Sequence, residues 1–313
     1  MQAEPIKPAS PSRSNLSKPG VLRTFFQSTT ALNFMYLPAL LLFGVFILYP
    51  LIKGIQISFT NWDGYSQDYS WVGFEKYARM FHDKNIGTTM KNTLIYGVGS
   101  TLLQNLIGLA YALFLDSKIR GKGLARTIVY MPVIISPLIM GYIFYFIFQY
   151  DGGAFNDIML LLGMEPTDWL ANGSRAVWII TFVNTYQYLG IAMIIYLGGL
   201  QSIPKEYYEA AQIDGARWWG RFANVTWPLL APAITVNVVI NLIGGLKLFD
   251  VIVALTNGGP GYASQSLSTM MYNLYFARQD AGYAAAMGNV MFLLICVLSL
   301  TVLHFLRRKE VRA

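Results

Sequence analysis

The sequence is poor in the residues on which most enzyme sites depend. Its 313 residues include one cysteine and two histidines, and only 12% are charged, about half of the roughly 25% in an ordinary soluble domain. The single Cys296 has no partner for a disulfide within the chain. His82 and His304 lie far apart in the sequence, which argues against a histidine metal site or a histidine-based triad. We therefore expect no catalytic residue and no metal site here.

A phosphate-binding loop is also missing. No G-x-x-x-x-G-K-[ST] string occurs, and the most similar stretch, Arg120-Gly121-Lys122-Gly123, lacks the leading glycine and the hydroxyl residue. The chain is therefore not expected to hydrolyse ATP through a P-loop, and we expect no cofactor in it. Any energy-driven process in which it takes part needs an energy source outside the chain.

Long apolar runs are abundant. Hydrophobic residues make up 55% of the sequence. A run of about 18 apolar residues crosses the roughly 30 Å hydrocarbon core as a helix, which pairs its own backbone polar groups. The sequence predicts six transmembrane helices, at 34–52, 93–115, 127–148, 176–200, 229–246 and 283–306. The predicted fold class is an all-α, multi-pass protein of the cell membrane.

The positions of the basic residues predict its orientation. Most of the 23 lysines and arginines lie in the segments 1–33, 116–126, 201–228 and 307–313. By the positive-inside rule, both termini and the two loops face the cytoplasm. The net charge of +7 is thus explained by orientation in lipid, and nucleic acid is not an expected partner.

We expect three regions along the chain. Residues 1–32 form a flexible basic cytoplasmic tail, because they lack the apolar content to fold. Residues 33–306 form the transmembrane domain, and 307–313 form a second basic cytoplasmic tail. Outside the membrane, 53–92 is long enough for a short helix or two, and 149–174 is expected to hold a short interfacial helix.

The cytoplasmic segment 201–228 predicts a helix, a turn and a return helix. Ser202 is a candidate N-cap and Pro204 suits the first turn. Glu206 and Glu209 then lie near the positive end of the helix dipole. Gly215 is expected to end this helix and let the chain turn.

The return helix begins with aromatic side chains. Trp218, Trp219 and Phe222 are expected to form one face that packs at the membrane interface. The first helix has a small-residue face around Ala210 and Ala211. From the residues alone, both an interfacial loop and a docking site for a soluble partner remain open.

The spacing in this segment resembles the EAA loop of ABC-importer permeases. Glu209-Ala210-Ala211 is followed by Gly215 and then by Val225-Thr226-Trp227-Pro228, whereas the usual pattern is E-A-A-x3-G-x9-I-x-L-P. Val225 and Trp227 depart from it. The resemblance implies the type I importer permease fold and a coupling helix that contacts an ATPase subunit. The candidate ATPase-coupling residues are then Glu209, Ala210, Ala211, Asp214, Gly215 and Ala216.

Further motifs are similar to the carbohydrate-uptake branch, specifically its maltose-type first permease. They are Leu37-Pro38, Tyr49-Pro50, the strings at 58–62 and 72–77, Met131-Pro132 and Leu255-Thr256-Asn257-Gly258-Gly259-Pro260. The resemblance covers about 35–306. It implies a non-catalytic permease subunit of a sugar importer. The implied partners are a second homologous permease, a cytoplasmic ABC ATPase dimer that binds ATP–Mg, an extracytoplasmic solute-binding protein, the sugar and membrane lipid.

Polar residues cluster in the fourth and fifth predicted helices. Such residues are costly in lipid unless they face protein or a wet cavity. The candidates for a substrate pathway are Asn184, Tyr186, Gln187, Tyr188, Asn237 and Asn241. The alternative for the amides is hydrogen bonding between helices. In maltose-type relatives the sugar contacts come from these two helices, and Asn184 and Asn241 fall at matching places.

The end of the fifth run has two features of its own. Gly244-Gly245 is expected to unwind, as helices do at many transporter sites. Lys247 and Asp250 either belong to the substrate pathway or form a structural ion pair, and we expect the ion pair. The asparagines that the family carries at the positions of Gly245 and Leu248 are missing, so the resemblance does not identify the ligand.

Three alternatives remain open from the sequence. An ion- or proton-coupled secondary transporter needs an intramembrane acid, for which Asp250 is the one candidate. A membrane scaffold or receptor component needs no transport at all. Within the resemblance, glycerol phosphate or another polyol is an alternative cargo.

Overall fold

The computed structural model describes residues 29–117 and 120–310. The predicted tail 1–32 lies almost wholly outside the described residues. Over the described ranges the chain is helical, and the β-structure is a single bridge between Thr60 and Trp71. Three stretches, labelled η, are turns of π-helix. The chain divides into two compact units, Met1–Lys53 and Gly54–Ala313.

The first unit contains a long apolar helix. It is built from α2 (Thr29–Phe43), η1 (Gly44–Leu48) and the start of α3 (Tyr49–Ile57), which continues into the second unit. The stretch Tyr36–Ile57 is long and apolar enough to cross a membrane. Its side chains from residue 36 onward are mostly exposed, so this helix needs lipid or another protein around it.

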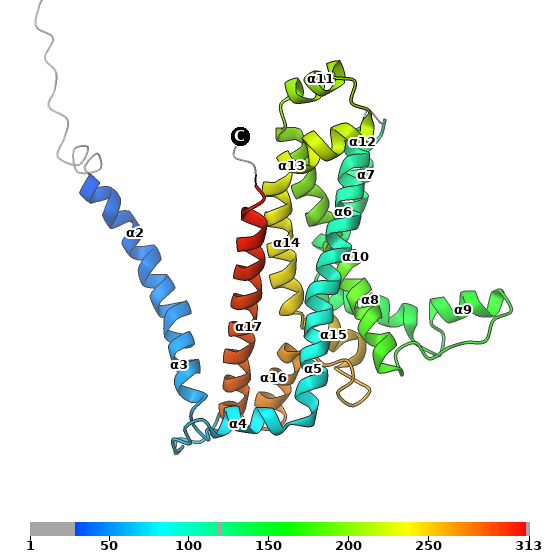
Figure 1. Ribbon diagram of the computed structural model, residues 1–313. Helices are drawn as coiled ribbons and strands as arrows, with labels where there is room; N and C mark the ends of the chain where they lie inside the picture. Colours follow the sequence, from blue (N-terminus) through cyan, green and yellow to red (C-terminus); the bar gives the residue numbers. More distant parts are fainter. Residues whose placement is uncertain (1–28, 118–119, 311–313) are drawn as a thin grey trace, which may run out of the picture. The chain divides into compact units, whose positions relative to one another are not determined.

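The second unit contains the other helices (Figure 1). They are α4 (Glu75–His82), α5 (Lys84–Leu94), η2 (Ile95–Gly99), α6 (Ser100–Asp116), α7 (Lys122–Ile134), α8 (Pro137–Phe148), α9 (Ala154–Leu161), α10 (Gly173–Ser202), α11 (Lys205–Ile213), α12 (Trp218–Arg221), η3 (Phe222–Thr226), α13 (Trp227–Leu229), α14 (Ala231–Leu246), α15 (Asp250–Thr256), α16 (Leu267–Phe276) and α17 (Ala281–Arg307). The expected short helices in 53–92 and 149–174 are confirmed as α4 and α9.

Among the described residues, four helices can span a membrane, and six can if each of two bent pairs counts as one span. The four are Tyr36–Ile57, Lys84–Asp116, Gly173–Ser202 and Ala281–Arg307. The bent pairs are α7 with α8, at 99°, and Trp218–Leu229 with α14, at 64°. The third predicted run, 127–148, is therefore not the straight helix that its hydropathy suggests. The fifth, 229–246, is one helix from Ala231 onward, and the bend lies at its start.

Proline is the physical reason for both bends. Ser136 precedes Pro137 and has φ −54° and ψ 136°, because a residue before proline avoids the helical region. The second bend lies at Leu230, between Pro228 and Pro232, each of which removes a helix hydrogen bond. Hydropathy alone does not report either effect.

The helix α10 lies at the centre of the second unit. Half of its most apolar 18-residue window is buried, against 11% for α17. Ile180 of α10 packs with Val251 of α15 in one buried cluster. Met193 and Leu197 pack with Leu230 in another. Because α10 contacts α6, α7 and α14, its polar residues face other helices.

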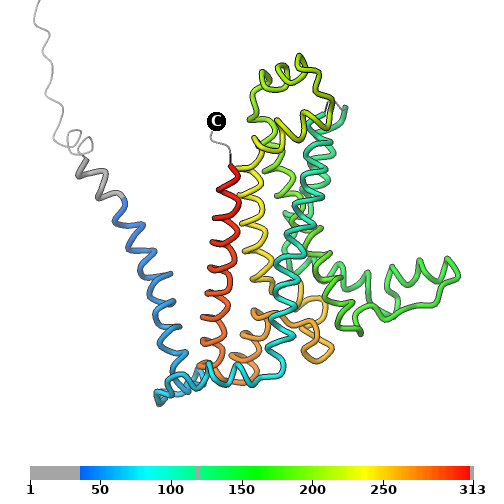
Figure 2. The backbone as a smooth tube through the Cα atoms, in the orientation of Figure 1, coloured from blue at the N-terminus to red at the C-terminus, as the bar shows by residue number. Residues whose placement is uncertain are grey.

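The two ends of this unit carry different elements. Figure 2, coloured along the chain, shows α11 and α12 at one end of the long helices, and α4 and α16 at the other. We refer to them as the α11 end and the α4 end. The helix α9 projects to the side from α8 (Figure 1).

Candidate functional site

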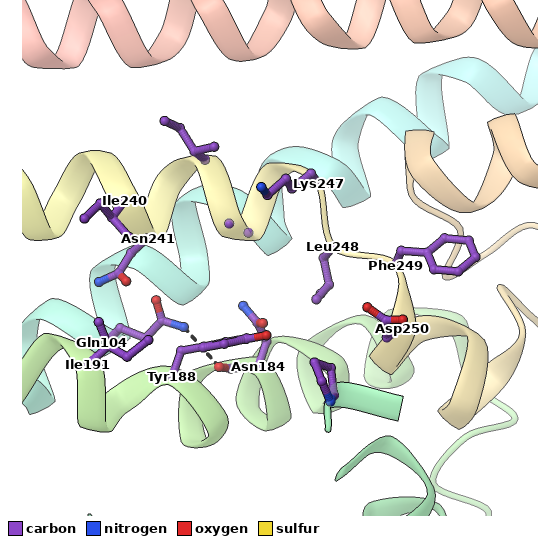
Figure 3. Close-up of a pocket in the computed structure, with 14 residues that line it drawn as sticks. Gln104, Asn184, Tyr188, Ile191, Ile240, Asn241, Lys247, Leu248, Phe249 and Asp250 are labelled. Atoms are coloured by element: carbon purple, nitrogen blue, oxygen red, sulfur yellow. Dashed lines mark hydrogen bonds between the residues drawn. The ribbon is translucent and has the colours of Figure 1, made fainter. Parts of the chain in front are cut away.

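A cavity of about 580 Å³ lies between α6, α10 and α14, within the usual ~300–1,000 Å³ of small-molecule sites. Its polar side chains come from all three helices and from the turn after α14. In Figure 3, Asn241 points from α14 toward Asn184 and Tyr188 of α10, with Gln104 of α6 beside them. These side chains come from helices that lie far apart in the sequence, and they meet because α10 and α14 both pack against α6.

Two buried amides at this cavity keep an unpaired atom. Gln104 is 1% exposed, and its Nε2 donates to the Asn184 carbonyl oxygen at 3.0 Å. Gln104 Oε1 and Asn241 Nδ2 are buried without a protein partner. An unmet buried polar group costs about 1–3 kcal/mol. Both residues line the cavity, so a small turn of either side chain would present its unpaired acceptor or donor to a polar guest.

Three predicted pathway residues do not line this cavity. Gln187 Nε2 donates to the Ile135 carbonyl oxygen at 3.0 Å, and Asn237 Nδ2 donates to the Ala192 carbonyl oxygen at 3.0 Å. Both amides therefore join neighbouring helices. Tyr186 packs its ring edge-on against Phe144 at 5.6 Å. Asn184, Tyr188 and Asn241 are the predicted residues that the fold brings together.

The turn after α14 differs from the prediction in two ways. The helix continues through Gly244 and Gly245 to Leu246, so the break falls at 247–249 instead. Over the described residues the salt bridges all involve Asp280, so the expected Lys247–Asp250 ion pair is wrong. Lys247 and Asp250 both border the cavity. The break between α14 and α15 separates them (Figure 3).

Gly245 is required by packing. A Cβ at this position would lie 2.7 Å from the Tyr96 carbonyl oxygen and 2.9 Å from the Cα of Gly97. These contacts are closer than real Cβ atoms allow, so α14 and η2 meet backbone to backbone. No larger side chain fits at 245, so packing excludes the asparagine that the resemblance would have placed there.

Gln104 was missed by the sequence analysis. It lies in the second apolar run, where it is the same kind of costly polar residue that identified Asn184 and Asn241. Applying that criterion to every apolar run would have found it. Its contact with Asn184 also explains why the α6–α10 pair forms one wall of the cavity.

The 201–228 segment forms a helix, turn and return, as predicted. The helix α11 begins at Lys205, with Pro204 as its N-cap and Glu206 in its first turn. Ser202 does not cap this helix. It is the last residue of α10, and its hydroxyl donates to the Gly199 carbonyl oxygen at 2.7 Å.

The end of α11 follows directly from Gly215. Its φ is +79°, the left-handed conformation that glycine adopts without steric cost. The Ala216 amide donates to the Ala211 carbonyl oxygen at 2.9 Å, and the Gly215 amide donates to that of Gln212 at 3.1 Å. These two bonds make a Schellman motif, with Asp214 as the C-cap.

The return helix carries the expected aromatic cluster. Trp218 stacks on Phe222 with ring centroids 5.6 Å apart. Trp219 lies edge-on to Trp218 at 4.5 Å. The helix α11 itself stays largely exposed, and Ile213 at its end is 87% exposed.

These features define a class of protein. Apolar helices long enough to cross a membrane enclose a cavity lined by buried amides, which is the construction of a membrane transport protein. More particularly, the chain belongs to the family of binding-protein-dependent transport system inner membrane components, whose family model matches residues 104–311.

Two similar proteins are named as permeases of transport systems. The chain is 33% identical over 274 residues to the probable starch degradation products transport system permease protein AmyD of Thermoanaerobacterium thermosulfurigenes, covering 88% of this chain and 93% of that protein. It is 33% identical over 270 residues to the trehalose/maltose transport system permease protein MalF of Thermococcus litoralis, covering 86% and 90%.

A solved structure has the same fold. It is a bacterial ABC transporter involved in the import of the acidic polysaccharide alginate, and one of its chains matches with a TM-score of 0.79. The identity is 27%, and the match covers 92% of this chain and 98% of that one. The resemblance to ABC-importer permeases found in the sequence is thereby confirmed.

Proposed function

We propose that this chain is one permease subunit of an ATP-driven, binding-protein-dependent carbohydrate importer. Relatives that share about a third of its sequence over nearly their whole length are named for starch products and for trehalose and maltose. The proposed assembly adds a second homologous permease, a cytoplasmic ATPase dimer that holds ATP–Mg, and an extracytoplasmic solute-binding protein. A related importer has been solved with a periplasmic protein bound.

The observation that carries the cargo class is the pair of unmet amide atoms at the cavity. Gln104 Oε1 is an unused acceptor and Asn241 Nδ2 an unused donor. A sugar hydroxyl can bond either of them once the side chain turns toward the cavity, because a hydroxyl both donates and accepts. Tyr188 adds an aromatic face and a hydroxyl to the same wall. We therefore assign the cavity to the sugar path.

The proposed topology is six spans with both termini in the cytoplasm. It puts the α11 end inside the cell, where Glu209, Ala210, Ala211, Asp214, Gly215 and Ala216 contact the ATPase. Closure of the ATPase dimer on ATP then moves α11, and the cavity changes the side to which it opens.

Uptake by the purified assembly tests this function. The four components are reconstituted in vesicles with ATP on the ATPase side, and entry of radiolabelled maltose and trehalose is measured. Asn241→Leu keeps the side-chain size but removes the free donor, so the sugar concentration for half-maximal uptake should rise about five- to tenfold, as for one lost hydrogen bond. The folded amount should stay unchanged.

Asn237→Leu is the matched control, one helical turn away on α14. Its amide bonds the Ala192 carbonyl oxygen, so this variant should lower the folded amount and leave the half-maximal concentration alone. Normal uptake by both Asn241→Leu and Gln104→Leu contradicts the assigned path. Uptake that needs an ion gradient and no ATP favours a secondary transporter, and uptake of glycerol phosphate alone contradicts the cargo.

A further inference from the structure

The helix α11 is attached to the rest of the protein at few points. Most of its side chains are exposed, whereas Tyr208 is half-buried. Tyr208 borders a second cavity, of about 730 Å³, formed by the ends of α6 and α10 and by the return segment. Its neighbours around this cavity include Phe114, Leu200 and Trp218. The Tyr208 ring therefore enters the body of the protein, and the opposite side of α11 faces away from it.

One hydrogen bond fixes this ring. The hydroxyl oxygens of Tyr208 and Thr226 are 3.2 Å apart. Thr226 Oγ1 also lies 3.5 Å from the Arg221 carbonyl oxygen, and either hydroxyl can be the donor in the Tyr208–Thr226 bond. Within the described part of the chain, no other side chain of α11 has a hydrogen bond or salt bridge to residues outside that helix.

Thr226 is connected through Leu230 and α14 to the wall of the proposed substrate cavity. It is 6% exposed and ends η3, and π-helical turns of this kind are frequent at functional sites. Its carbonyl oxygen accepts from the Leu230 amide at 2.9 Å. Leu230 is fully buried against α10. The next residue starts α14, which carries Asn241 to the cavity.

We infer that Tyr208 is a positioning residue for coupling, which transmits a displacement of α11 through Thr226 to α14. The inference rests on the proposed function, in which α11 contacts the ATPase. Since the ring and the hydroxyl of Tyr208 have different contacts, the two parts can be separated by mutation. The hydroxyl alone makes the bond to Thr226.

Tyr208→Phe keeps the ring in its cavity and removes the bond. Tyr207→Phe is the matched control, because Tyr207 lies on the same helix, is 47% exposed and has no side-chain bond in the structure. In the full assembly, the ratio of maltose molecules imported to ATP molecules hydrolysed should fall about fivefold in Tyr208→Phe, as for one neutral hydrogen bond. Tyr207→Phe should leave the ratio unchanged, and both should co-purify with the ATPase normally.

A double-mutant cycle identifies the partner. Thr226→Val should lower the ratio as Tyr208→Phe does, and the double variant should fall no further. Thr226→Ser keeps the hydroxyl and should have the same ratio of imported maltose to hydrolysed ATP as the unaltered protein. Additive effects, a Tyr208→Phe ratio equal to that of Tyr207→Phe, or a loss that only follows reduced co-purification would each overturn the inference.

Glu209→Lys separates this inference from the proposed function. If Glu209→Lys abolishes ATP-driven uptake while Tyr208→Phe behaves like its control, the coupling segment stands and only the role of Tyr208 is overturned. If Glu209→Lys also transports normally, the coupling role of α11 fails, and the role of Tyr208 fails with it.

Discussion

The two ends of the second unit are attached in opposite ways. At the α4 end, Asp280 at the start of α17 accepts from Lys76 Nζ at 2.8 Å and from Arg79 at 2.7 Å, both on α4. The Gly282 amide also donates to the Trp62 carbonyl oxygen at 2.9 Å. At the α11 end, by contrast, the Tyr208 hydroxyl makes the one side-chain hydrogen bond between the described residues of α11 and the rest of the protein.

The contacts around Asp280 extend to a wider network. The Arg79 guanidinium lies 4.7 Å from the centre of the Tyr283 ring, and the Tyr77 hydroxyl bonds both Ser58 and Asn289. Regions with many buried contacts open rarely, and regions with few open readily. We therefore expect the α4 end to be a rigid platform and α11 to move relative to the long helices.

Removing the charge at the α4 end should have the largest effect. In Asp280→Asn, Lys76 keeps its charge at 8% exposure but loses its carboxylate partner. Breaking a buried pair in this way costs about 3–5 kcal/mol, and we expect a value near the lower figure because Arg79 is half exposed. Thermal unfolding of the purified protein in detergent measures the loss.

Lowering the pH should cause the same loss of stability in the unaltered protein. Burial raises the pKa of Asp280, but hydrogen bonds from Lys76 and the Tyr283 amide outweigh it, and the pKa lies below its ordinary value. The stabilisation is therefore complete above the unfolded pKa of about 3.9 and is lost as pH falls through the folded value. Asp280→Asn should lack this dependence, whereas the exposed Asp68→Asn should retain it. An unchanged unfolding temperature in Asp280→Asn would refute the rigid platform.

A smaller loss of stability is expected when a side chain is added at Gly282, also at the α4 end. A Cβ at position 282 would lie 2.1 Å from the Thr60 carbonyl oxygen, so Gly282→Ala must push the 56–62 backbone away from α17. Overpacking of this kind costs about 1–3 kcal/mol. Gly198→Ala is the control, because no atom lies within 4 Å of its added Cβ and alanine favours a helix. If Gly282→Ala and Gly198→Ala unfold at the same temperature, position 282 has room for a Cβ, and the close contact between Thr60 and α17 is contradicted.

The sequence predicted which segments are helical better than it predicted their course. Apolar length is a local property, so the apolar runs correspond to helices in the structure, and Gly215 ends α11 as expected. The bends at Ser136 and Leu230 depend on backbone torsions beside prolines, and no hydropathy pattern reports them. Hydropathy also does not indicate the break at 247–249, which separates Lys247 from Asp250.

The site was predicted in part for a related reason. A helix that is apolar on every side, such as α10, has no polar stripe that tells which amide faces a cavity and which bonds a neighbouring helix. Asn184 and Gln187 therefore looked alike in the sequence, and only the packing of α7 and α14 separates them. Gln104 lies beside Asn105 in the second apolar run, and both amides were overlooked there.

The smallest effect on global stability is expected at the α11 end. Gly215→Ala places an L-residue at φ +79°, which costs about 1–2 kcal/mol, whereas asparagine visits this conformation routinely. Because α11 has few contacts with the long helices, that cost should open the end of α11 alone. Hydrogen exchange of peptides covering 205–221 should be faster in Gly215→Ala than in Gly215→Asn, with the thermal unfolding temperature unchanged in both. A fall in that temperature as large as in Gly282→Ala would mean that α11 unfolds together with the long helices, and the difference between the two ends would disappear.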